Sequence, residues 1–290
     1  MSFAAETKEA LCALFIKNEC CELSLLWGLL RYGGDFSEER IRLCTNSAPV
    51  TALCRALLSK HFGIEVPSGG HLTLSARDAA FIYHAYHADE GARAFSAWLR
   101  CEHCTGAFLR GVFLAAGNLS DPGNSYHLDF LMQDAESAQA LGAFLQSLDM
   151  PARSTVRGAQ PLLYYKGSEA IEDFLVTIGA RRAAFTVMDE KIRKDIRNNT
   201  NRVINLEVAN LSKTASNAAK QLRAIALLQK SGKLSHLEEA LQITAHLRQE
   251  HPDATLSALA ALHDPPLTKS GLNHRLAKLT TAAKEEKERP

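Results

Sequence analysis

The chain has 290 residues and a formal net charge of +1, with 46% hydrophobic and 22% charged residues. This composition is typical of a soluble globular protein with room for two domains, and the lack of an apolar run of about 18 residues argues against a membrane-spanning helix. The charge is polarised, because residues 191–290 carry 17 Lys and Arg against 10 Asp and Glu, a net +7, which leaves −6 for residues 1–190. A local positive surface is typical of nucleic-acid contact, although a solvated charged linker and tail would give the same count.

The N-terminal segment predicts a cytoplasmic location. Glu6, Lys8 and Glu9 place charges where a signal peptide would have its apolar core. The chain has seven cysteines, an odd number, and they lie in apolar helical surroundings. A reducing compartment fits this usage better than a disulfide framework does.

The first 190 residues contain an internal repeat. Segment 21–34 aligns with segment 104–117 at an offset of 83 residues, so that Gly28 falls on Gly111. Each copy is an apolar helix with one glycine in its middle and another at its end. A glycine inside a helix costs roughly 1 kcal/mol relative to alanine, and we expect these two to allow the close approach of two helix backbones.

The same order of elements is predicted after each copy. After the first copy we expect a strand at 40–45, a helix from Ser47 to Gly63 with Pro49 in its first turn, extended segments at 64–66 and 71–74, and a helix from Ala76. After the second copy we expect a strand at 126–131, a helix at 135–148, a strand at 162–165 and a helix at 168–178. Both repeats, at about 20–100 and 103–180, therefore read helix, strands, helix, strands, helix. Two unrelated leucine-rich helices are the alternative.

The C-terminal third is predicted to be helical. A basic, Asn-rich linker at 189–207 should break near Asn198, Asn199 and Asn201, since asparagine often caps or interrupts a helix. Helices are then expected at 209–230 and 237–249. Thr255 can cap a short helix at 256–263, whose inward side chains we expect to be Leu256, Leu259, Ala260 and Leu262.

A second short helix is predicted at 268–279, after the rigid turn at 264–266. Its inner face is Leu272, Leu276 and Leu279, and its remaining surface is polar and basic. The side chains that we expect to contact DNA are Thr268, Lys269, Ser270, Asn273, His274, Arg275 and Lys278. Further phosphate contacts are expected from Arg193, Lys194, Arg197, Arg202 and Lys213. The pattern alone fits a recognition helix and the polar surface of a small helical bundle equally well.

The chain contains several longer motifs, and the later ones, which consist largely of polar residues, are more specific than an apolar helix pattern. The motifs are FLRGVFLAAG at 108–117, SDP at 120–122, SYHL at 125–128, RNNTNRVIN at 197–205, AN at 209–210, KT at 213–214, HPD at 251–253 and DPPLTKSGLNHR at 264–275. These segments resemble the WhiA family of bacterial DNA-binding regulators, and the resemblance covers essentially the whole chain.

The resemblance implies an α+β fold followed by an all-α domain. Residues 1–188 would form a duplicated LAGLIDADG homing-endonuclease-like αββαββα module, 189–207 a linker, and 208–290 a helical domain with a helix-turn-helix at about 254–288. The implied function is sequence-specific binding of double-stranded DNA at the nucleoid, to control transcription in cell division and sporulation-type differentiation. Regulatory proteins or RNA polymerase would be possible partners of the N-terminal domain.

The resemblance to homing endonucleases raises the question of catalysis. In active members, an acid before the terminal glycine of each repeated helix holds a divalent cation that activates water. Gly33 and Ala116 occupy these two positions here, and neither offers the carboxylate oxygen that Mg²⁺ needs. We therefore predict a protein that is not an enzyme, with no metal and no cofactor. The alternatives are a nucleoid-associated protein-binding scaffold without promoter control and, with less support, an active metal-dependent endonuclease.

The cysteines leave one alternative open. Cys101 and Cys104 form a lone C-x-x-C pair, which Cys20 and Cys21 could complete as a four-ligand zinc set. Packing as small hydrophobic side chains is the favoured interpretation. No glycine-rich phosphate loop is present.

Overall fold

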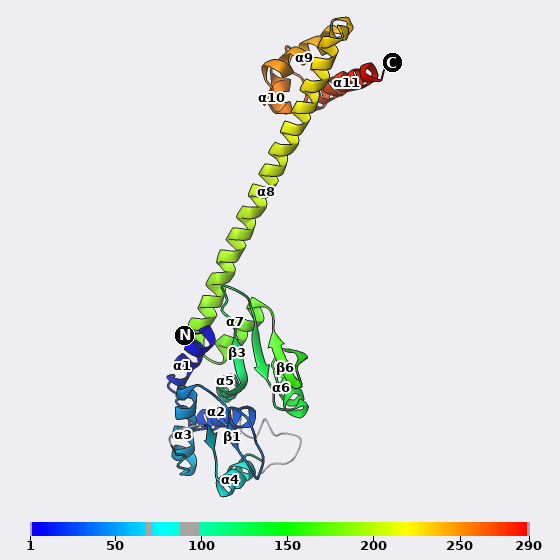
Figure 1. Cartoon of the computed structure of the whole chain (residues 1–290). Coiled ribbons are helices and arrows are strands. Elements are labelled where there is room, and N and C mark those ends of the chain that lie inside the picture. The colour runs from blue at the N-terminus through cyan, green and yellow to red at the C-terminus, as the bar shows by residue number, and fades with distance from the viewer. Residues whose placement is uncertain (1, 68–70, 88–98, 289–290) are drawn as a thin grey trace. The chain divides into compact units, whose positions relative to one another are not determined.

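The computed structural model describes residues 2–67, 71–87 and 99–288 (Figure 1). The chain divides into two compact units, Met1–Asp195 (the N-terminal unit) and Ile196–Pro290 (the C-terminal unit), and each is described by itself. Among the described residues, no helix has both the length and the apolar character needed to cross a bilayer.

The N-terminal unit contains the two repeats that the sequence predicted. Its helices are α1 (Phe3–Cys12), α2 (Glu19–Tyr32), α3 (Ala48–Phe62), α4 (Ala76–His87), α5 (Cys104–Ala116), α6 (Ala135–Ser147), α7 (Ser168–Thr177) and the start of α8 (Arg181–Lys230). Its strands are β1 (Arg42–Leu43), β2 (Leu72–Thr73), β3 (Gly117–Leu119), β4 (Leu128–Leu131), β5 (Arg153–Arg157) and β6 (Gln160–Tyr165). The first copy thus reads α2, β1, α3, β2, α4, and the second reads α5, β3–β4, α6, β5–β6, α7.

The strands form two antiparallel sheets of unequal size. The first copy has a two-stranded sheet of β1 and β2, and the second has four strands in the order β3-β4-β6-β5. Phe130 pairs with Leu163 in register, and both side chains are buried in the core. In the first copy, an isolated bridge between Phe36 and Ile41 marks a short hairpin in the place of β3 and β4. Strands β3 and β5 were not predicted: β3 follows α5 without a turn, and every residue of β5 is exposed.

The two central helices, α2 and α5, pack against each other at the core of the N-terminal unit. A Cβ atom added to Gly28 would lie 2.4 Å from the carbonyl oxygen of Phe108, and one added to Gly111 would lie 2.2 Å from that of Leu25. Real Cβ atoms do not approach backbone atoms this closely. The predicted close approach of two helix backbones at these glycines is therefore confirmed.

The helix α8 corrects one expectation about the 189–207 linker. The segment around Asn198, Asn199 and Asn201 is helical throughout, so the predicted break there is wrong. Asparagine costs a helix only a few tenths of a kcal/mol per residue, and these side chains are exposed and have no need to interrupt the backbone. Thr200 also bonds back to the carbonyl of Ile196, as a side chain inside a helix does.

The C-terminal unit is helical, as the sequence predicted. The end of α8 is followed by a short 3-10 helix (Lys233–His236), α9 (Glu239–Glu250), α10 (Leu256–Ala261) and α11 (Lys269–Lys287). Its core includes Ile225, Leu228, Leu241, Ala245, Leu259, Leu272, Leu276 and Leu279. One predicted core residue is wrong: Leu262 is 48% exposed, and its neighbour His263 is buried instead. The chain leaves the helix at Leu262, so helical periodicity no longer sets which side chain points inward.

We predict that alanine at Gly28 or Gly111 destabilises the N-terminal unit. Each new methyl group would overlap backbone atoms of the partner helix, and overpacking of this kind typically lowers the free energy of unfolding by about 1–3 kcal/mol. Gly142 in α6 is the matched control, because its added Cβ would meet only Leu163 Cδ2, at 3.8 Å. Gly142→Ala should be neutral, or stabilising by up to about 1 kcal/mol. Denaturant unfolding of the full-length variants tests this, and a Gly111→Ala variant as stable as its parent would contradict it.

Candidate nucleic-acid interface

The helices α10 and α11 form a helix-turn-helix whose two N-termini are capped by threonine side chains. Thr255 Oγ1 accepts a hydrogen bond from the backbone N–H of Ala258 at 3.2 Å, and Thr268 Oγ1 accepts one from Gly271 at 3.1 Å. The turn is closed by the N–H of Leu267, which donates to the carbonyl of Ala260 at 2.9 Å. The predicted cap at Thr255 is confirmed, and such caps typically stabilise a helix by about 1 kcal/mol.

The two faces of α11 differ in the way the sequence predicted. Leu272, Leu276 and Leu279 are at most 1% exposed and form part of the core of the unit. All seven residues predicted to contact DNA lie between the N-cap and the middle of this helix: Thr268, Lys269, Ser270, Asn273, His274 and Lys278 are exposed, and Arg275 is half-buried. The structure therefore brings this set together on an accessible helix surface, and their contact with DNA stays a prediction.

Arg275, in the second turn of α11, lies close enough to His263 to interact with it electrostatically. Burial, together with the positive charge of Arg275, lowers the pKa of His263, which is 5% exposed. His263 is therefore neutral at physiological pH, and the cation beside it is Arg275. The sequence missed this histidine because the helix predicted at 256–263 ends at Ala261, before His263.

A buried arginine supports the segment that leads into α10. Arg248 of α9 is 2% exposed, and its Nη1 donates to the carbonyl oxygen of Ala254 at 2.8 Å and, more weakly, to those of His251 and Pro252 at 3.4 and 3.5 Å. Burial lowers the pKa of this guanidinium. Three carbonyl oxygens of this loop thus accept hydrogen bonds from the same guanidinium group. Arginine is almost never fully buried, so the sequence suggested no such role.

The five predicted phosphate contacts on α8 are not equivalent. Lys194 donates to the carbonyl of Pro122 at 2.7 Å and lies 4.4 Å from the ring centroid of Tyr126, so its charge is engaged within the N-terminal unit. Arg193 pairs with Glu190 at 2.8 Å. The remaining three, Arg197, Arg202 and Lys213, belong to the C-terminal unit and are exposed.

The C-terminal ends of α2 and α5 carry Gly33 and Ala116, the two positions at which the resemblance to homing endonucleases would place an acid. A Cβ atom at Gly33 would lie 2.4 Å from the carbonyl oxygen of Leu29, so an acid could not stand there without a backbone shift. Asp35 is exposed and pairs with Arg40 at 3.1 Å. Asp134 accepts a bond from the N–H of Ser137 at 2.7 Å and caps α6. Across the described ranges, no group of carboxylates here has the spacing of a metal site.

The chain matches known proteins along its whole length. A family model described as the WhiA LAGLIDADG-like domain matches residues 105–197, and one described as the WhiA C-terminal HTH domain matches residues 200–283. The chain is 33% identical to "Probable cell division protein WhiA" of Carboxydothermus hydrogenoformans, over 98% of both chains. The chain belongs to the WhiA family.

Other WhiA proteins support the same arrangement. The relative from Desulfitobacterium hafniense is 32% identical, with 98% of this chain and 96% of that protein covered. The crystal structure of full-length WhiA from Thermotoga maritima superposes with a TM-score of 0.58 at 23% identity, covering 98% of this chain and 99% of that one. This confirms the WhiA fold predicted from the sequence, a LAGLIDADG-like module followed by a helix-turn-helix domain.

We predict that Arg248→Leu loosens the loop before α10. The substitution leaves backbone carbonyls without their donor, and an unsatisfied buried acceptor costs about 1–3 kcal/mol. Hydrogen exchange of residues 251–261 in the full-length protein should become faster, while exchange in the N-terminal unit stays unchanged. Arg223→Leu, at an exposed position of α8 in the same unit, is the control and should leave that exchange as it was. If residues 251–261 exchange at the same rate in both variants, Arg248 does not hold this loop.

Proposed function

We propose that this chain is a sequence-specific DNA-binding regulator of transcription that acts in cell division and sporulation-type differentiation, and that it does not cleave DNA. The observation that carries the proposal is the surface of α11. Its predicted DNA-contact residues are accessible on a helix whose opposite face is locked into the core of a helix-turn-helix. The description of relatives as cell division proteins supports the process in which it acts.

The side chains of α11 divide into two roles in this proposal. Asn273 and Ser270 can hydrogen-bond to base edges in the major groove, and these bonds would select the sequence. Lys269, Arg275 and Lys278 would bind phosphates and fix the position of the helix on the duplex. The unpaired backbone N–H groups at the start of α11 favour an anion at the same end. The net +7 of residues 191–290 supplies the wider positive field.

The proposed absence of nuclease activity follows from the ends of the paired helices. Gly33 and Ala116 have no oxygen ligand to offer, and Asp35 and Asp134 are engaged by Arg40 and Ser137. Metal-assisted hydrolysis needs carboxylates that hold the cation beside the scissile phosphate. The module would then serve as a binding domain, for regulatory proteins or RNA polymerase, in the cytoplasm at the nucleoid.

A second candidate function has one observation in its favour. Residues 1–190 carry a net charge of −6, which suits a protein partner better than a DNA backbone. A nucleoid-associated scaffold that affects division or chromosome segregation without promoter control would have this character. Genome-wide mapping of bound sites, combined with transcript changes on deletion, separates the two. Bound promoters whose transcripts do not change would favour the scaffold.

We predict different binding defects for Lys269→Ala and Asn273→Ala. Loss of one phosphate contact should weaken binding to every sequence and reduce the slope of log K against log salt by about 1. Loss of one base contact should remove about 1–3 kcal/mol of discrimination and leave that slope unchanged. Titrations at several salt concentrations, with a duplex selected from random DNA by the full-length protein, measure both. Lys284→Ala, in the last turn of the same helix, is the control. If it weakens binding as much as Lys269→Ala does, the assigned surface is wrong.

We also predict no strand cleavage. Supercoiled plasmid incubated with the full-length protein and Mg²⁺ or Mn²⁺ should stay supercoiled, because Gly33 and Ala116 supply no carboxylate to hold the cation. Metal-dependent nicking that Asp35→Asn abolishes would contradict this prediction and restore the nuclease interpretation. Asp35 is the variant of choice because it is the exposed acid nearest in sequence to Gly33.

A further inference from the structure

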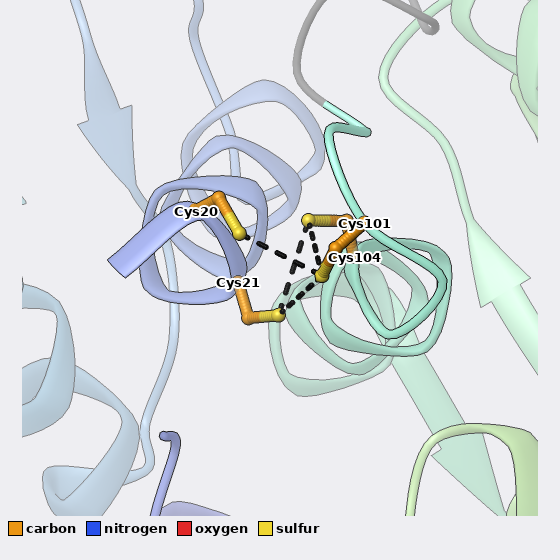
Figure 2. Close-up of side chains that lie close together, drawn as sticks. All are labelled: Cys20, Cys21, Cys101 and Cys104. Carbon is orange, nitrogen blue, oxygen red and sulfur yellow. Dashed lines mark hydrogen bonds between the residues drawn. The ribbon is translucent and has the colours of Figure 1, made fainter. Parts of the chain in front are cut away.

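Four cysteines from two distant segments meet at the N-terminal ends of α2 and α5 (Figure 2). Cys20 and Cys21 lie in the first turn of α2, Cys104 is the first residue of α5, and Cys101 stands three residues before it. Their four Sγ atoms all lie within 4.8 Å of one another. The structure thus assembles the complete set that the sequence left as the less favoured alternative to packing as small hydrophobic side chains.

Four of the six distances between the sulfur atoms are close to those of a tetrahedral ligand set, and the other two are at most 4.8 Å. Cys101 Sγ lies 3.5 Å from those of Cys21 and Cys104 and 3.6 Å from that of Cys20, and the Sγ atoms of Cys21 and Cys104 are 3.9 Å apart. Four sulfurs at about 2.3 Å from a central zinc ion stand about 3.8 Å apart. A disulfide needs about 2.05 Å, so these contacts are not disulfide bonds.

Positive charge and a hydrogen-bond donor lie near the four sulfurs. The first turns of two helices converge on them, and the positive end of a helix lowers the pKa of a nearby thiol. The Asn18 side-chain amide also lies 3.8 Å from Cys101 Sγ, within the range of a weak N–H···S bond. Arg110 of α5 lies close enough to interact electrostatically with Cys21. The negative charge of a four-thiolate zinc centre would therefore be partly balanced by the protein.

The position of the cluster allows an ion to enter and then be enclosed. Cys20 and Cys101 are half-buried, whereas Cys21 and Cys104 are buried at 4% and 0% exposure. Two half-buried and two buried sulfurs would form a closed set of four protein ligands, which is typical of structural rather than catalytic zinc.

We propose that Cys20, Cys21, Cys101 and Cys104 bind one structural Zn²⁺ ion that ties the two repeats together. The site is separate from the degenerate nuclease positions. Cys21 and Gly33 stand at opposite ends of α2, twelve residues or about 18 Å apart along the helix. Zinc is the metal that a closed tetrahedral set of four thiolates favours, since soft sulfur ligands exclude Mg²⁺ and Ca²⁺. This inference does not depend on the proposed regulatory function.

The test begins with the full-length protein purified without chelators. Elemental analysis should find one zinc per chain, released when a mercurial reagent blocks the thiols. Cys20→Ser and Cys104→Ser should each reduce the zinc content to less than about a tenth of that value and shift thermal unfolding to lower temperature. Cys44→Ser, at an exposed cysteine outside the cluster, is the matched control and should keep one zinc.

Replacement of zinc by Co²⁺ reports on the site without any substitution. Tetrahedral thiolate ligation should give intense d–d bands in the red and a sulfur-to-cobalt charge-transfer band in the near ultraviolet. This measurement decides the question even if both cysteine variants fail to fold. No stoichiometric metal together with no such bands would overturn the proposal. So would iron with acid-labile sulfide, which would identify an iron–sulfur cluster instead of zinc.

Discussion

The N-terminal unit depends on the contact between the backbones of α2 and α5. Gly28 and Gly111 have no side chains, so each helix can press against carbonyl oxygens of the other. The leucine and phenylalanine side chains around this contact form the core on which both sheets lie. Residues from both repeats meet at the N-terminal ends of this helix pair and again near its C-terminal ends. The chemistry of the unit is therefore decided at those two ends.

The two ends of the pair carry different side chains. At the C-terminal ends, where a homing endonuclease holds its catalytic cation, Gly33 and Ala116 leave no oxygen ligand. At the N-terminal ends, Cys20 and Cys21 meet Cys101 and Cys104. A scaffold that elsewhere positions a hard, oxygen-bound cation for hydrolysis would here position soft thiolates for a structural ion. The proposed zinc site is independent of the positions of Gly33 and Ala116, because neither end contributes residues to the opposite one.

The C-terminal unit differs from the N-terminal unit, because its candidate site is the exposed surface of one helix, α11. Three leucines anchor α11, threonine side chains cap both helices of the motif, and the guanidinium of Arg248 holds the loop before α10. Binding of DNA through such a surface requires that the helix be held rigidly in place. The charge is polarised along the chain, with a net −6 over residues 1–190 and a net +7 over residues 191–290, and a positive surface favours contact with DNA.

The sequence by itself determined the features that arise from neighbouring residues. The glycine inside each repeated helix, the cap at Thr255 and the leucine spacing of α11 all follow from helical periodicity and local hydrogen bonding. Only the tertiary structure decided which distant residues meet. It brought together two cysteine pairs about 80 residues apart and buried Arg248. Local patterns record contacts within a few residues of the chain, whereas these outcomes depend on which faces of separate elements pack together and how close their backbones come.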